Sequence, residues 1–196
     1  KKDYKNAEKY FKRLNKISQY NFVFDNFIGN VLIAWVKASQ GKEEESHRFI
    51  EKIPNIYNQV SRTQNIFLQC YFDNESTQKS LEELIGNTDY NFSRYNFFLI
   101  NYLISKNKID EAKKIIKLSR EKHSSNLLLK QTEFFFKNNE NEKIINFFNC
   151  KNPKDSLAEF FYVIANLYSS EEEYRLSNFY LKISLHLNNK FLSNNA

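Results

Sequence analysis

Apolar residues recur along the chain with helical spacing. In residues 4–14, the side chains of Tyr4, Ala7, Phe11 and Leu14 fall on one stripe of a helix, whereas a half-buried strand would alternate at every second residue. The whole chain contains only three glycines and two prolines, so residues that interrupt helices are scarce. The pattern predicts an all-α protein of helices joined by short polar turns.

The same spacing continues as pairs of helices. We predict a half repeat at 1–20, hairpins at approximately 21–54, 57–86, 90–123, 125–149 and 154–188, and the start of a next helix at 189–196. Small residues stand early in the second helices, where two helix backbones cross closely; they are Ala7, Ser46, Ser80, Ala112 and Ser177. The 125–149 pair fits this pattern least well.

This period resembles that of the tetratricopeptide repeat, a helical hairpin of about 34 residues. The last pair matches best, with Phe161, Ile164, Ala165 and Tyr168 in its first helix and Ser177, Leu181 and Ser184 in its second. The resemblance implies a right-handed α-α superhelix, a single solenoid over residues 1–196 with about five hairpins. The proline that usually follows the second helix is missing in most units, so related helical repeats remain an alternative.

A narrower resemblance concerns two segments that keep their order along the chain. Residues 32–46, "LIAWVKASQGKEEES", and residues 155–191 are similar to stretches of a largely uncharacterised alphaproteobacterial family of tetratricopeptide-repeat proteins. The resemblance implies a bacterial protein and favours the periplasm or cell envelope over the cytoplasm. The chain begins without Met and ends just after the apolar pair Phe191 and Leu192, so we expect a fragment truncated at both ends.

The formal charge of +6 raises the question of a nucleic-acid partner. Lysines interleave with acids in stretches such as residues 110–117, "DEAKKIIK", which is typical of solvated helix faces. We therefore expect nucleic-acid binding to be unlikely. No stretch approaches the roughly 18 to 20 consecutive apolar residues that span a bilayer.

Motifs that would indicate catalysis or metal binding are weak in this sequence. Cys70 and Cys150 are isolated, and we interpret them as free thiols beside aromatic residues. The histidines, His47, His123 and His186, have no second ligand at helical spacing. We predict a non-enzymatic protein without cofactor or metal.

Binding is better supported, because the first helices of stacked hairpins line a concave groove. The residues expected on that groove are Arg94, Phe97, Asn101, Glu159, Tyr162 and Asn166, with Trp35 nearer the start. Aromatic rings beside amides suit a peptide or a partner helix, although the same rings could pack between hairpins. The predicted function is a protein-interaction scaffold.

The alternative function is a structural or assembly module that stacks end to end on itself or on the rest of a longer chain. That alternative predicts exposed apolar patches at the ends, formed by Tyr4, Phe11, Phe191 and Leu192.

Overall fold

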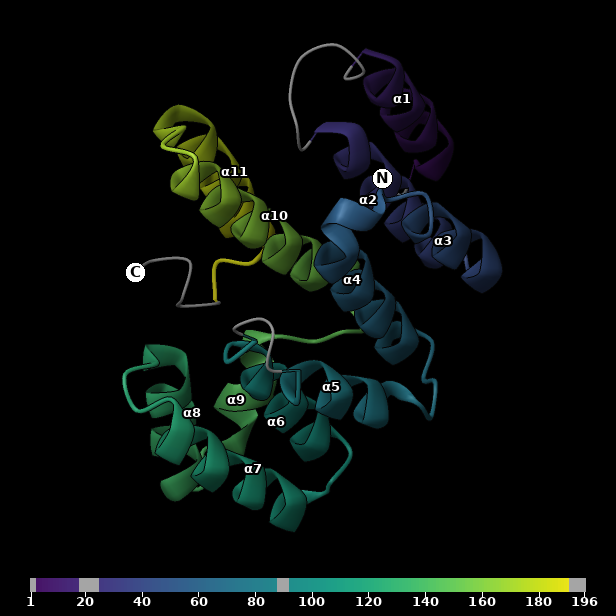
Figure 1. Cartoon of the computed structure of the whole chain (residues 1–196). Helices are drawn as coiled ribbons and strands as arrows, with labels where there is room; N and C mark the ends of the chain where they lie inside the picture. The colour runs from purple at the N-terminus through teal and green to yellow at the C-terminus, as the bar shows by residue number, and fades with distance from the viewer. Residues whose placement is uncertain (1–2, 18–24, 88–91, 191–196) are drawn as a thin grey trace. The chain divides into compact units, whose positions relative to one another are not determined.

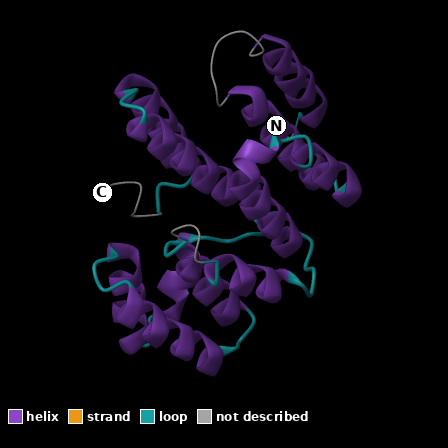
Figure 2. Cartoon of the chain, in the orientation of Figure 1, coloured by secondary structure: helices purple, strands orange, loops and turns teal. Residues whose placement is uncertain are grey.

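The computed structural model describes residues 3–17, 25–87 and 92–190. Within these ranges the chain forms helices and connecting turns and contains no strand (Figure 2). The predicted all-α class is confirmed. Phe191 and Leu192 lie outside the described residues.

Eleven α-helices and one 3₁₀ helix are present in the described residues (Figure 1). Their bounds are α1 (Tyr4–Ile17), α2 (Asp25–Ser39), α3 (Glu43–Ile50), η2 (Asn55–Tyr57), α4 (Asn58–Tyr71), α5 (Thr77–Ile85), α6 (Tyr95–Ser105), α7 (Ile109–Lys122), α8 (Leu127–Lys137), α9 (Asn141–Phe147), α10 (Pro153–Ser170) and α11 (Tyr174–Leu187).

The chain divides into two compact units, where the sequence suggested one solenoid. Unit 1 consists of residues 1–74 and 150–187, and unit 2 of residues 75–149 and 188–196. Unit 1 is therefore built from two segments that are separated in sequence. The packing of these two segments against each other depends on contacts that local helix periodicity does not encode.

The core of unit 1 lies where α10 contacts α2 and α4. Phe27 of α2 and Phe160 of α10 are fully buried, and their ring centroids lie 6.3 Å apart in an edge-on arrangement. In Figure 1, α11 runs alongside α10 as its hairpin partner. A simple solenoid stacks each repeat on its sequence neighbours alone. The contacts of α10 with α2 and α4 depart from that rule.

A buried cation connects the first three helices of unit 1. The ammonium of Lys37 in α2 lies 3.0 Å from a carboxylate oxygen of Glu8 in α1 and 2.9 Å from one of Glu45 in α3. These two carboxylates raise the pKa of Lys37, with Glu45 contributing most, and burial opposes them. The residue is only 8% exposed, and its charge is stable there because both partners are ionised.

Unit 2 is organised around α6, which contacts α5, α7, α8 and α9. Nine of the eleven residues of α6 are buried. A helix that is apolar around most of its circumference must be covered on several sides. The continuous apolar run of residues 97–100 lies at the centre of the unit, where the neighbouring helices cover it.

Five helical hairpins share one backbone turn. Each turn contains a residue with positive φ: Gly41 (76°), Asp73 (60°), Asn107 (58°), Asn139 (57°) and Glu172 (61°). In each turn the N–H of the next residue donates to the carbonyl five positions earlier, as from Lys108 to Leu103 at 2.8 Å. This is the Schellman motif that ends helices at a left-handed residue. The turns are 32 to 34 residues apart, and the irregular 125–149 pair contains the same turn.

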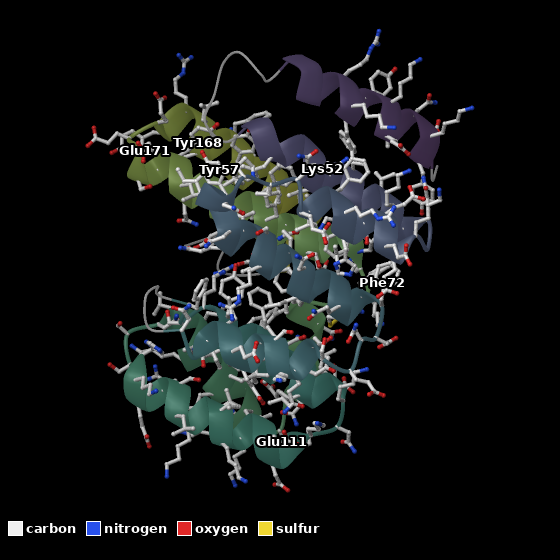
Figure 3. The ribbon with its side chains drawn as sticks, turned by 45° about the vertical axis from the view of Figure 1, so that its right-hand side comes forward. Lys52, Tyr57, Phe72, Glu111, Tyr168 and Glu171 are labelled. Carbon is white, nitrogen blue, oxygen red and sulfur yellow. A yellow bond between two sulfur atoms is a disulfide. The ribbon has the colours of Figure 1, made fainter. Side chains whose placement is uncertain are left out.

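The interpretation of Cys70 and Cys150 as free thiols is wrong. The two residues form a disulfide within unit 1, drawn in yellow in Figure 3. Lys151 reinforces the connection, because its ammonium donates to the Tyr71 carbonyl at 2.8 Å and pairs with Asp73. The disulfide thus joins the two segments of unit 1. Cys70 lies near the end of the first segment, in α4, and Cys150 lies at the start of the second segment, just before α10. Their separation of 80 residues hid this pairing from the sequence.

Replacing Glu172 by Gly should stabilise the protein by about 1 kcal/mol, because the left-handed conformation costs a residue with a side chain about 1–2 kcal/mol. The melting temperature should rise by roughly 2–4 °C. Gly41→Ala is the matched control: a Cβ at Gly41 meets no atom within 4 Å, so only backbone conformation should lower the melting temperature. Equal effects of the two substitutions would contradict this account of the turns.

Removing the disulfide with the Cys70→Ser/Cys150→Ser pair should lower the free energy of unfolding by about 4 kcal/mol, since the bond closes a long loop in the unfolded chain. Urea unfolding of the oxidised wild type and the variant gives this difference. A reductant should destabilise the wild type to the level of the variant and leave the variant unchanged. A wild type insensitive to reductant would exclude a stabilising disulfide.

Candidate functional site

A cleft of about 440 Å³ lies between α7 and α8 of unit 2. We refer to it as the α7–α8 cleft. Its lining residues are Lys113, Ile116, Lys117, Arg120 and Glu121 from α7, and Glu133, Phe136 and Lys137 from α8. The volume falls in the range of ligand sites, about 300–1,000 Å³. Ile116 and Phe136 supply its apolar component, and charged side chains supply the remainder.

Glu133 connects the two helices at this cleft. Its carboxylate lies 3.1 Å from Arg120 Nε and 2.7 Å from Lys137 Nζ. The Lys137 hydrogen bond lowers the pKa of Glu133, partial burial opposes this effect, and Arg120 adds to the lowering. Arg120 also donates to the carbonyls of His123 and Ser124 at the end of α7. These contacts hold Arg120 and Glu133 in place as part of the cleft wall.

Lys113 and Lys117 are different, because both are exposed and neither forms an ion pair with a described residue. They stand one helical turn apart on α7. Glu111, labelled in Figure 3, lies in the first turn of this helix and pairs with Lys108 at 3.8 Å. The cleft therefore presents two available ammonium groups next to an apolar surface.

Four of the residues expected on a concave groove are buried instead. Phe97 is 0%, Trp35 and Glu159 are 1%, and Asn101 is 5% exposed. Trp35 donates its indole N–H to Gln64 Oε1 at 2.8 Å and meets Tyr71 edge-on. These side chains therefore lie in the interiors of their units.

Asn101 shows why a polar residue stands within the apolar run of α6. Its amide donates to the carbonyls of Ile144 at 2.8 Å and Phe148 at 2.9 Å. Asn188 donates to the Phe147 carbonyl at 2.8 Å. The last carbonyls of a helix lack partners within the helix, so both asparagines complete the end of α9. Asn101 is a positioning residue for the fold.

The other three expected groove residues keep accessible surface. Arg94 immediately precedes α6 in unit 2 and is half-buried. Tyr162 is half-buried and Asn166 is exposed on α10 of unit 1. Asn166 donates to the Tyr162 carbonyl within its own helix at 2.8 Å. The three residues therefore come from different units, and none lines the α7–α8 cleft.

The ends of the chain show apolar exposure at different residues from those expected. Tyr4 and Phe11 of α1 are half-buried. Tyr10 on the same helix is 62% exposed, and Tyr174 and Phe179 on α11 are 65% and 55% exposed. Two large aromatic side chains are therefore exposed on α11, within a helix that the sequence assigned to the last full hairpin.

The α7–α8 cleft was not predicted from the sequence, because only the net charge of the whole chain was considered. Residues 113–137 contain seven lysines and arginines and two acids, a net charge of +5, which residues 1–16 also carry. A window of one hairpin would have found this concentration. In α7 the acids Asp110 and Glu111 come first, and the lysines at 113, 114 and 117 follow without an acid between them.

Two further searches cover the described residues alone. No group of three or more histidine, cysteine, aspartate or glutamate side chains is arranged to hold a metal ion. No helix in the described ranges is both long enough and apolar enough to cross a membrane.

Comparison of the chain with models of protein families, with curated proteins and with solved structures found no match. The resemblance to tetratricopeptide-repeat proteins thus depends on the residues quoted above and on the repeated turn.

Glu133→Gln should reduce stability at neutral pH by about 1 kcal/mol or less, the range for partly exposed ion pairs. Because folding lowers the pKa of Glu133, its contribution is present above the unfolded pKa of about 4.5 and is lost as pH falls through the lower folded value. Thermal unfolding between neutral pH and acid should therefore show the two proteins converging at low pH. Glu121→Gln removes an exposed carboxylate from the same cleft, and it should leave this pH dependence unchanged.

Proposed function

We propose that this chain is a non-enzymatic protein-interaction scaffold of the tetratricopeptide type, whose α7–α8 cleft binds a segment of a partner protein. The observation that carries the proposal is the cleft itself, an opening between adjacent hairpins that combines apolar side chains with unpaired ammonium groups. Binding clefts for peptide segments use this combination of an apolar anchor position and polar rims.

The repeated turn supports the scaffold assignment. Five hairpins that end their first helix with the same pair of backbone hydrogen bonds, at intervals of 32 to 34 residues, match the period of tetratricopeptide repeats. A superhelix of such hairpins presents surfaces between neighbouring units. The α7–α8 cleft lies at such a place, between the second helix of one hairpin and the first helix of the next.

The composition of the cleft favours binding over catalysis. Its lining contains lysine, arginine, glutamate, isoleucine and phenylalanine, and no serine, cysteine, histidine or aspartate. Glu133, the one lining residue with a resolved pKa shift, stays ionised near its two cations. A general base would need a pKa near the working pH, and this shift goes in the opposite direction.

The disulfide supports a location in an oxidising compartment. Disulfides persist in secreted, periplasmic and cell-surface proteins, whereas cytosolic thiols are kept reduced. The Cys70–Cys150 bond joins the two segments of unit 1 and so acts as a structural element. This favours the periplasm or cell envelope, in agreement with the narrower sequence resemblance.

The second candidate function is self-assembly through α11, which the exposed Tyr174 and Phe179 favour. In this case another copy of the chain would cover these aromatic side chains, and the α7–α8 cleft would have no partner.

Site-specific photocrosslinking in the source cells tests these candidates. A benzophenone amino acid in place of Phe136 should yield discrete protein adducts in the envelope fraction, because Phe136 lines the cleft. The same replacement at Phe179 and at the exposed Tyr10 provides controls that should yield none. Adducts only at Phe179, with a second copy of the chain, would establish assembly instead. No adduct at Phe136 would contradict the proposed function.

A further inference from the structure

The α7–α8 cleft lies within a basic segment of the chain. Residues 113–137 contain Lys113, Lys114, Lys117, Arg120, Lys122, Lys130 and Lys137 against Glu121 and Glu133. The net charge of this segment is +5, and residues 1–16 carry the same net charge. Such a local field favours an anionic partner.

The available charges are those of α7. Arg120 and Lys137 already share Glu133, so their attraction for a further anion is partly satisfied. Lys113 and Lys117 are exposed and unpaired among the described residues, and both line the cleft. They are four residues apart, about 6 Å along the helix axis. Two carboxylates separated by one turn of a partner helix would match this spacing.

Apolar side chains lie next to these charges, and they favour a protein segment as the partner. Ile116 and Phe136 line the cleft. A phosphate backbone meets cations without filling an apolar cleft, whereas a protein segment with large apolar side chains fills it.

We propose that the α7–α8 cleft recognises an acidic amphipathic segment of another protein. A large apolar side chain of that segment packs against Ile116 and Phe136, and its carboxylates pair with Lys113 and Lys117. This inference rests on the proposed function and adds the chemistry of the partner. Charge complementarity selects the acidic segment, and the apolar lining distinguishes it from a nucleic acid.

The test uses labelled peptides with the full chain, measured by fluorescence anisotropy. The probe peptide contains Phe and Leu one helical turn apart, flanked by glutamates. One control peptide replaces each Glu by Gln, and a second keeps Glu and replaces Phe and Leu by Ser. A labelled single-stranded oligothymidylate reports nucleic-acid binding. The probe should bind on the order of tenfold more tightly than either control peptide, since both its charge and its apolar groups contribute.

Protein variants locate the binding surface. Lys113→Glu/Lys117→Glu should weaken the probe by about tenfold or more, and the effect should shrink at high salt. Lys154→Glu/Lys182→Glu makes the same change in net charge at exposed lysines of unit 1 and should leave binding unchanged. Circular dichroism verifies that both variants are folded. Ile116→Ala should weaken the probe and not the peptide that lacks Phe and Leu.

Three results would overturn the inference: no binding of the probe to the wild type, equal binding of the Gln peptide, or tighter binding of the oligothymidylate. The crosslinking experiment separates this failure from failure of the proposed function. Protein adducts at Phe136 without binding of the acidic probe would retain the scaffold and reject the acidic partner. Loss of both would reject the cleft as a binding site.

Discussion

The left-handed turn that ends the first helix of each hairpin is the constraint on which the rest of the structure depends. A helix can reverse within a few residues only if its last carbonyls find donors, and the two bonds of the Schellman motif supply them. At each of the five turns the chain adopts positive φ, which costs little for Gly and Asn and more for Glu172. The regular spacing of the turns keeps the hairpins alike although their side chains differ.

Buried polar side chains form further hydrogen bonds and ion pairs inside the units. Asn101 and Asn188 satisfy the end of α9, Gln64 accepts from the indole of Trp35, and Lys37 forms ion pairs with two carboxylates from α1 and α3. In each case a polar side chain sits inside a unit because a fixed partner removes the cost of leaving water. In a sequence, such residues resemble binding residues. The reason is that polar residues within apolar runs occur at interfaces as well as at helix ends.

Unit 1 is held together by contacts between segments that are distant in sequence. Its first helices and its last hairpin pack around Phe27 and Phe160, and the disulfide fixes the two segments together. Unit 2 combines a buried central helix with a cleft whose rim is basic. The main buried contacts of the two units therefore lie around α10 and α6.

The sequence alone determined the helical class and the pairing of neighbouring helices, because apolar spacing and the scarcity of Gly and Pro are local properties. It also contained the basic segment at residues 113–137, which is found when the net charge is counted over the length of one hairpin. It did not determine the roles of Phe97, Asn101, Glu159 and Trp35, because a helix has several apolar faces and their neighbours decide which ones are covered. The Cys70–Cys150 bond and the contacts of α10 with α2 and α4 were decided by tertiary structure alone, since they join residues that only the folded chain brings together.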